Sequence, residues 1–142
     1  MCDPYRICVV NWQDEAVALR DIRTAVFVYE QQVPEDLEWD EFDPVSLHVL
    51  ALNSNDQPIG TARLLPDGHI GRMAVLREWR GKGVGSAMLQ RILEESSHRG
   101  MQKAMLNAQM AAIKFYEKFG FQVSGEEFME AGIPHIKMIL QS

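Results

Sequence analysis

The chain has 142 residues, of which 46% are hydrophobic, and it carries a formal net charge of −6 at pH 7. This length and composition predict one globular domain over residues 1–142 and exclude a disordered chain. The apolar runs are too short to cross a bilayer, and the acidic balance argues against nucleic acid as a partner. Cys2 and Cys8 form neither a disulfide framework nor a zinc-type spacing, so we expect a reduced, cytoplasmic protein without a metal site.

The first predicted elements are a strand at residues 5–10 and a helix at residues 15–29. Asp14 stands just before the helix and can cap its first turn. The apolar residues of the helix recur at helical spacing and form its buried stripe, which consists of Leu19, Ile22, Val26 and Tyr29.

An acidic segment follows at residues 30–43, with seven acids and no base. Such a run is typical of a solvated loop with a helical turn. The alternative is an acidic wall that attracts a cationic substrate.

Three strand-like runs come next, at residues 47–53, 59–65 and 69–75. Turn-forming sequences separate them, at residues 53–57 and again at residues 66–68. Because short turns join neighbouring antiparallel strands, we expect a consecutive antiparallel meander.

A glycine-rich loop then leads into a helix that stops near Gly100. Glycine recurs at 81, 83 and 85, and four bases face one acid nearby, namely Arg72, Arg77, Arg80, Lys82 and Glu78. Glycines allow close backbone approach, and a helix start offers unpaired N–H groups, so this arrangement suits an anionic phosphate. The Walker pattern fails at Gly83 and the dinucleotide fingerprint fails at Ser86. A tight turn without a ligand is the alternative.

The last part of the chain predicts a strand at residues 103–108, a helix at residues 112–119, and strands at residues 121–127 and 133–140. The order of strand, helix and strand from residue 70 to residue 103 implies a parallel pair joined by a right-handed crossover. The predicted fold class is therefore α+β, with a mixed, mostly antiparallel sheet and helices on both faces.

Four segments together resemble the GCN5-related N-acetyltransferases. They are Arg23–Gln31 (R-x-x-V-F-V-x-E-Q), Arg80–Gly85 (R-G-K-G-V-G), Leu106–Phe121 (L-N-A-Q-x-x-A-x-x-F-Y-E-K-F-G-F) and Gly132–Met138 (G-I-P-H-I-x-M). The first and last segments, with the strand that carries His48, are similar to the ElaA/YjcF-like branch. The resemblance implies a sheet in which two parallel strands splay apart and acetyl-CoA lies in the gap.

The resemblance also implies which residues bind the cofactor. The pantetheine arm would pair with the strand residues Met73, Ala74 and Val75, and the pyrophosphate with the loop residues Arg80, Gly81, Lys82, Gly83, Val84, Gly85 and Ser86. Asn107, Gln109, Ala112 and Phe115 would line the other side, and Tyr116 would lie near the CoA sulfur. The sequence departs from the family pattern at Arg77, where many relatives have proline, and at Gln109, where many have asparagine.

The acceptor side is less defined. Acyl transfer to an amine requires a deprotonated amine, a donor to the thioester oxygen and a proton for the leaving thiolate. A backbone amide near Val75 and the hydroxyl of Tyr116 can meet the last two needs. The candidate bases are Glu30, His48 and His135, and the candidate acceptor contacts are Arg23, Phe27, Glu30, His48 and His135. Glu30, His48, His135 and Arg23 each also have a purely structural interpretation.

The sequence thus predicts an acetyl-CoA-dependent N-acetyltransferase that acts on a primary amine of a small molecule or peptide. Two other interpretations remain, which are an acetyl-CoA sensor without turnover and an interaction protein that kept the fold. We expect neither nucleic acid nor a membrane as a partner. The oligomeric state is open, with a homodimer among the alternatives.

Overall fold

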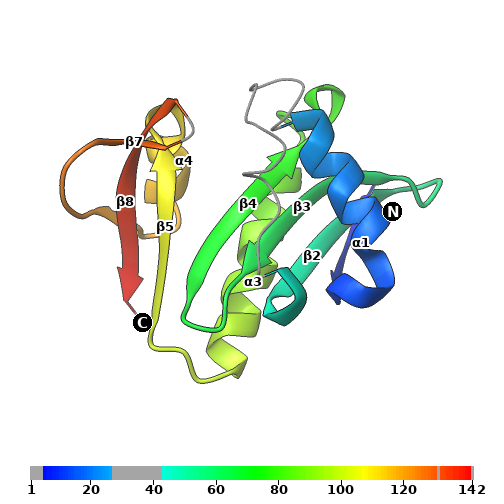
Figure 1. The fold of residues 1–142 in the computed structure, drawn as a ribbon, viewed down its shortest axis with the longest axis horizontal. Coiled ribbons are helices and arrows are strands. Elements are labelled where there is room, and N and C mark those ends of the chain that lie inside the picture. The colour runs from blue at the N-terminus through cyan, green and yellow to red at the C-terminus, as the bar shows by residue number, and fades with distance from the viewer. Residues whose placement is uncertain (1–4, 27–42, 131, 142) are drawn as a thin grey trace.

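The computed structural model describes residues 5–26, 43–130 and 132–141, and it contains an eight-stranded sheet with helices on both faces (Figure 1). The strands are β1 (Tyr5–Val10), β2 (Leu47–Asn53), β3 (Pro58–Leu64), β4 (His69–Val75), β5 (Lys103–Gln109), β6 (Gln122–Val123), β7 (Phe128–Glu130) and β8 (Ile133–Gln141). The helices are α1 (Trp12–Arg23), α3 (Val84–His98) and α4 (Ile113–Glu117), with short 3₁₀ turns η2 (Asp43–Val45), η3 (Arg77–Trp79) and η4 (Met110–Ala112).

The sheet has the order β1-β2-β3-β4-β5-β8-β6, and β7 pairs with β8. The predicted meander is confirmed, because β2, β3 and β4 pair consecutively and antiparallel. The predicted parallel pair is confirmed as well, with β4 and β5 joined through α3. The fold class is therefore the predicted mixed α+β sheet.

Alternating side chains of β2 explain why helices cover both faces. Val49 and Ala51 belong to the main core with Met88 and Leu89 of α3, whereas Leu50 packs with Trp12 of α1. Successive strand residues point to opposite faces, so one strand contributes to both layers. The main core also includes residues of β5 and β8, so it extends from the N-terminal strands to the C-terminal part of the sheet.

Helix α1 begins earlier than predicted. Its N-cap is Asn11, whose side chain accepts a hydrogen bond of 2.8 Å from the backbone N–H of Asp14. Asp14 instead lies in the first turn, where its carboxylate accepts a hydrogen bond from Asn11 Nδ2 at 2.9 Å. Asparagine caps helices as well as aspartate does, so the sequence offered two starts, and the Trp12 contact to Leu50 favours the earlier one. Residues 24–26 continue as a π-helical turn, and Tyr29 lies outside the described residues.

The predicted strand at residues 121–127 is wrong in its extent. Only Gln122 and Val123 form β6, and the chain pairs with β8 again at Phe128–Glu130. Gly125 has a φ of +92° between these two stretches. This left-handed conformation breaks an extended strand, so β8 has two short partners on its outer side instead of one long one.

Among the described helices, none is long and apolar enough to cross a membrane. The same part of the chain holds no group of three or more His, Cys, Asp or Glu side chains placed to bind a metal ion.

Candidate active site

The two parallel strands separate after a short paired stretch. β4 and β5 pair only through His69 with Met105 and Ile70 with Leu106, at the start of β4. Beyond this point β5 pairs with β8 along its length, while β4 stays with β3 (Figure 1). The carboxyl ends of both strands are thus open toward each other, which is where ligands bind in sheets with parallel strands. The predicted splay is present.

A β-bulge shapes the open end of β4. Thr61 pairs with Ala74 and Arg63 with Gly71, so two residues of β4, at positions 72 and 73, oppose the single residue Ala62. The extra residue shifts the side-chain alternation, so Met73 and Val75 pack against the same main core as Ile70, which lies three residues before Met73. Ala74 lies on the α1 face instead, with Ile22 and Val26.

The glycine-rich loop connects this end of β4 to α3. Gly81 and Gly83 have φ values of +76° and +85°, and Gly83 is the N-cap of α3 without a side-chain hydrogen bond to the cap. The first backbone N–H groups of α3 therefore point out of the helix start, where they can bind an anion. Arg80 Nε donates a hydrogen bond of 3.0 Å to the carbonyl of Val75, which ties the loop to the strand end.

Tyr116 bridges the open end from the opposite side. Its hydroxyl lies 3.9 Å from Met73 Sδ, within the distance of a hydrogen bond to sulfur. The ring contacts Phe115 and Phe121 edge to face. Burial raises the pKa of Tyr116 to about 12, because the charged phenolate is poorly solvated there. Tyr116 is therefore a neutral O–H donor at physiological pH, and its side chain extends from α4 to β4.

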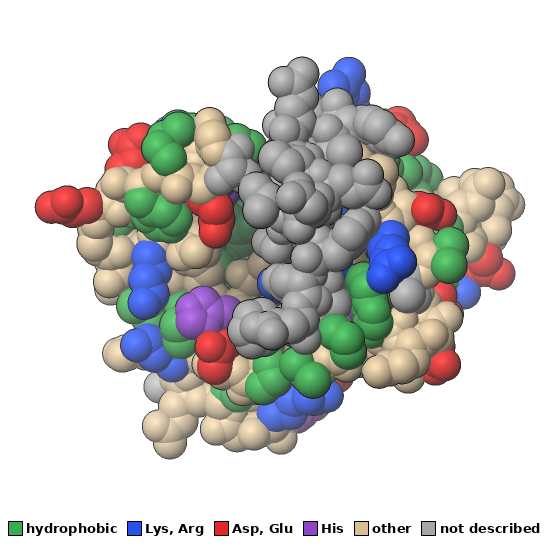
Figure 2. Space-filling view, in the orientation of Figure 1, with side chains coloured by type: hydrophobic (Ala, Val, Ile, Leu, Met, Phe, Trp, Pro, Cys, Tyr) green, Lys and Arg blue, Asp and Glu red, His purple; other side chains and the backbone are tan. Residues whose placement is uncertain are grey.

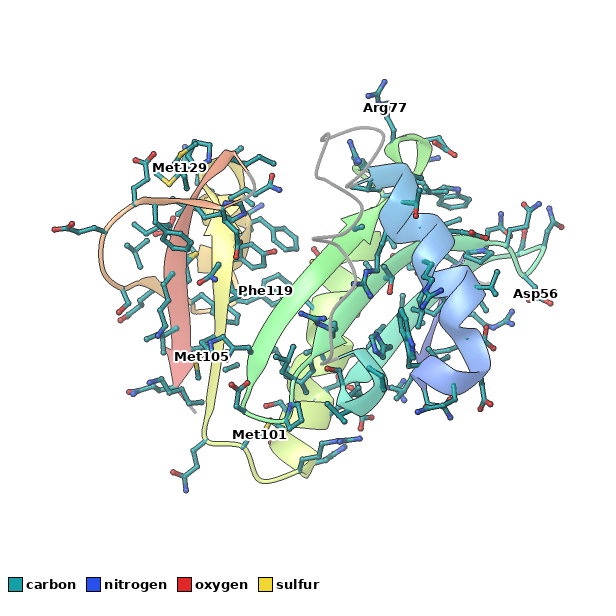
Figure 3. All side chains as sticks on the ribbon, in the orientation of Figure 1. Asp56, Arg77, Met101, Met105, Phe119 and Met129 are labelled. Carbon is teal, nitrogen blue, oxygen red and sulfur yellow. The ribbon has the colours of Figure 1, made fainter. Side chains whose placement is uncertain are left out.

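Gly85 completes the convergence of the loop, β4 and α4. A Cβ at this position would lie 3.6 Å from Phe115 Cζ and 3.9 Å from Val75 Cγ2. Figure 3 shows the side chain of Phe119, which follows α4, between strands β5 and β4. The predicted pantetheine strand, pyrophosphate loop and cofactor-lining helix therefore meet at one place. The residues in contact there are Met73, Val75, Gly85, Phe115 and Tyr116.

The remaining predicted cofactor residues lie on one face of β5 and in the turn η4 that follows it. Asn107 and Gln109 alternate with Ala108, which belongs to the main core, so they lie on the opposite face. Asn107 pairs with Lys137 and Gln109 with His135 of β8. Ala112 is half-buried in η4, directly before α4.

His135 is the predicted base that lies on the same side of the gap as Tyr116. It is 7% exposed, its Nδ1 lies 2.7 Å from the carbonyl of Ile133, and its Nε2 lies 3.5 Å from Glu130 Oε2. Phe128 stacks on the ring at a centroid distance of 6.1 Å. With Nδ1 donating to the carbonyl, Nε2 faces a carboxylate. Sequence reasoning did not single out Glu130.

His48 and Arg23 lie elsewhere, on the α1 face. His48 has no exposed surface and contacts the Trp12 ring at 5.4 Å between centroids, and the Arg23 guanidinium lies 5.5 Å from the same ring. His48 pairs with Arg63 in β3, which in turn pairs with Gly71 near the closed end of the splay. The predicted Glu30 and Phe27 lie outside the described residues.

Comparison with known proteins decides the family. The model of the acetyltransferase (GNAT) domain matches residues 10–142. The chain belongs to the GNAT acetyltransferases. It is therefore an acyltransferase. Its sequence is similar to that of the Escherichia coli protein ElaA, with 34% identity over 92% of this chain and 95% of ElaA. The crystal structure of ElaA superposes with a TM-score of 0.84, covering 95% of this chain and 98% of ElaA.

Two further comparisons agree with this assignment. The N-acetyltransferase YjcF of Bacillus subtilis is 37% identical over 83% of this chain and 86% of its own. An acyl-CoA N-acyltransferase from Pseudomonas aeruginosa superposes with a TM-score of 0.85 at 30% identity, covering 95% of this chain and 98% of the other. The resemblance inferred from the four sequence segments is thus confirmed, including its ElaA/YjcF-like branch.

The surface of this GNAT protein shows no grouping of charge by sign on the face seen in Figure 2, where the described acidic and basic side chains are interspersed. At the end of the molecule that carries η3, Arg77 extends outward (Figure 3). The Lys82 ammonium contacts an aromatic ring, with its Nζ 5.3 Å from the centroid of the Trp79 ring. Sequence reasoning did not predict this contact.

Proposed function

We propose that this GNAT protein is an acetyl-CoA-dependent N-acetyltransferase that acetylates a primary amine of a small molecule or peptide. Family membership supports acyl transfer, and the identity of donor and acceptor is the content of the proposal. One observation carries it, namely that the neutral Tyr116 hydroxyl spans the open end of the splay to Met73 at 3.9 Å. A proton donor is thus located where the two parallel strands separate.

The loop and strand fit the donor. Backbone N–H groups at residues 81–86 would hold the pyrophosphate, because a Cβ built at Gly81 meets nothing within 4 Å and the start of α3 has no side-chain cap. The bulged end of β4, at residues 73–75, would pair with the pantetheine arm. Asn107, Gln109, Ala112 and Phe115 would contact the arm from the β5 side.

The chemistry follows from these placements. The neutral amine attacks the thioester carbon, a C–N bond forms, and the C–S bond breaks. A backbone amide near Val75 would donate to the carbonyl oxygen as its negative charge develops. Tyr116 would give its proton to the leaving thiolate, and the proton released by the amine would pass to a base and to solvent.

For that base we favour His135, which shares the Tyr116 side of the gap and has Glu130 3.5 Å from its Nε2. The fully buried His48 would need a water-filled path to the amine. Glu30 as base, and Arg23 and Phe27 as acceptor contacts, stay proposals from the family resemblance.

The test is an acceptor screen that measures CoA release from acetyl-CoA with amino acids, polyamines, aminosugars, aromatic amines and peptides. We expect release above the amine-free rate with at least one class. A separate calorimetric titration measures acetyl-CoA binding. Binding without release across the panel would favour an acetyl-CoA sensor, and absence of binding would contradict any acetyl-CoA-dependent function.

A further inference from the structure

Tyr5 lies at the first described position of the N-terminal strand, yet it contacts the glycine-rich loop. Its hydroxyl donates a hydrogen bond of 3.3 Å to the backbone carbonyl of Lys82, across 77 residues of sequence. A Cβ built on Gly83 would lie 3.2 Å from the same hydroxyl. The Tyr5 hydroxyl therefore lies directly beside the peptide bond between Lys82 and Gly83.

The ring of Tyr5 is itself held in place. It contacts the Trp79 ring edge to face, with centroids 6.5 Å apart and planes at 84°. The same Trp79 ring lies 5.3 Å from Lys82 Nζ, and Tyr5 packs against the main core. The hydroxyl is thus presented to the loop by a ring that the fold fixes on two sides.

Holding a carbonyl also determines where the next amide points. The Lys82–Gly83 peptide is trans, so its C=O and N–H groups point in opposite directions. With the carbonyl bonded to Tyr5, the Gly83 N–H is directed away from β1. Glycine adopts positive and negative φ with similar ease, so this peptide could otherwise rotate and replace the N–H by a carbonyl.

We infer that Tyr5 is a positioning residue for the pyrophosphate site: it fixes the Lys82–Gly83 peptide so that the Gly83 N–H faces the anion. This inference rests on the proposed acetyl-CoA function. A rotated peptide would present carbonyl oxygen to a phosphate, which is repulsive. Tyr5 therefore acts through the backbone of the loop and does not itself contact the thioester.

The test compares the wild type with Tyr5→Phe, which keeps the ring and removes only the hydroxyl. Losing one hydrogen bond that orients a binding group should weaken CoA binding roughly threefold to tenfold by calorimetry. Pantetheine lacks the pyrophosphate, and its binding can be measured from chemical-shift changes of the β4 amides. Its affinity for Tyr5→Phe should stay within about twofold of its affinity for the wild type. In ligand-free ¹H–¹⁵N spectra, the Gly83 amide should move more than the β1 amides.

Gln90→Ala, on the exposed side of α3 and outside the candidate site, is the control. It should keep wild-type CoA affinity and an unshifted Gly83 amide. Unchanged CoA affinity in a folded Tyr5→Phe would overturn the inference about Tyr5. It would leave the proposed function standing, since the wild type would still bind CoA. Equal losses for CoA and pantetheine would show a general structural role and would also overturn it. If the wild type binds no CoA, both proposals fail.

Discussion

At the scale of single residues, Tyr116 carries the clearest chemical assignment. Its hydroxyl lies at the open end of the splay, and burial keeps it protonated by raising its pKa to about 12. Tyr116→Phe retains the ring contacts with Phe115 and Phe121 and removes only the proton donor. We expect kcat to fall roughly 10²–10⁴-fold, the usual range for a positioned acid, while the KM for acetyl-CoA changes little.

Steady-state kinetics with the acceptor found in the screen would measure this effect. Tyr5→Phe serves as the control, because we expect it to raise the KM for acetyl-CoA and to retain the wild-type kcat. A normal kcat in Tyr116→Phe would mean that the thiolate is protonated from another source and that Tyr116 serves only the core.

The raised pKa of Tyr116 also predicts how stability changes in alkali. The unfolded tyrosine ionises near its ordinary pKa of 10.0, whereas the folded residue ionises only near 12. Between these values the unfolded chain binds fewer protons, so the free energy of unfolding falls as pH rises, by up to about 3 kcal/mol. Below pH 10 this contribution is fully present.

Urea denaturation of wild type and Tyr116→Phe at several pH values from neutral to strongly alkaline would measure this loss. The unfolding free energy of the wild type minus that of Tyr116→Phe should be constant below pH 10 and should decrease above it. Tyr5→Phe keeps Tyr116 and should still lose stability between pH 10 and 12. Parallel curves for wild type and Tyr116→Phe would contradict the assigned burial of the phenol.

Residues of the candidate site differ in how far sequence could predict them. Tyr116 and the loop glycines were predicted because they belong to contiguous motifs with fixed spacing. Tyr5 and Trp79 were not, since their roles depend on contacts between β1 and the loop that no local pattern encodes. Glu130 was missed for a similar reason, because its distance to His135 is set by the β7–β8 pairing.

At the scale of elements, the start of α3 gives a test of where the cofactor passes. Gly85 lies in the first turn, and a methyl group there would be in ordinary contact with Phe115 and Val75. Gly85→Ala should therefore stabilise the helix by up to about 1 kcal/mol. The same methyl group would enter the space between β4 and α4, so we expect CoA affinity to fall about tenfold or more, equivalent to about 1.4 kcal/mol.

Thermal melting and CoA titration of the same variant measure the two effects. Gln90→Ala, on the exposed side of α3, is the control and should change neither quantity strongly. Gly83→Val would be a poorer test, since the φ of +85° at Gly83 strains any side chain. Unweakened CoA binding in Gly85→Ala would show that the ligand does not pass this point.

Sequence periodicity predicted which elements exist better than where they end. The three meander strands and α3 were predicted because their alternation or helical spacing is uninterrupted. The errors arose where two local signals compete: Asn11 against Asp14 at the start of α1, and an extended run against Gly125 after β6. The Trp12 contact to Leu50 favours the earlier start of α1, whereas the left-handed backbone of Gly125 ends the extended run after β6. The β4 bulge left no sequence signal, because it depends on the register with β3.

At the scale of the whole molecule, the sheet consists of two parts that meet at one short parallel stretch. β1 to β4 carry α1, α3 and the glycine-rich loop, and β5 to β8 carry Tyr116 and His135 (Figure 1). A ligand in the splay would contact both parts, so the loop would supply binding and the C-terminal part the proton donor. This division explains why Tyr5→Phe and Tyr116→Phe should affect different kinetic parameters.

Net charge gives the prediction about the acceptor. The chain carries −6 at pH 7, and seven of its acids lie within residues 30–43. We propose that this acidic segment attracts a protonated primary amine, so added salt should lower kcat/KM for the amine at saturating acetyl-CoA. An aromatic amine that is uncharged at neutral pH should show no such salt dependence, which separates attraction of the acceptor from a general salt effect.

Two triple variants distinguish the segment from net charge. Glu35→Gln, Asp36→Asn and Glu38→Gln together change the net charge from −6 to −3, since three negative charges are removed. Replacing the exposed Glu94, Glu126 and Glu127 by glutamine gives the same −3 elsewhere on the chain. The triple variant in the acidic segment should lose most of the salt dependence, and its kcat/KM for the cationic amine should fall several-fold. The reason is that electrostatic steering of the amine depends on charge near the entry path. The second should retain most of both. Equal effects of the two variants would assign the attraction to overall charge and leave the acidic segment as a solvated surface.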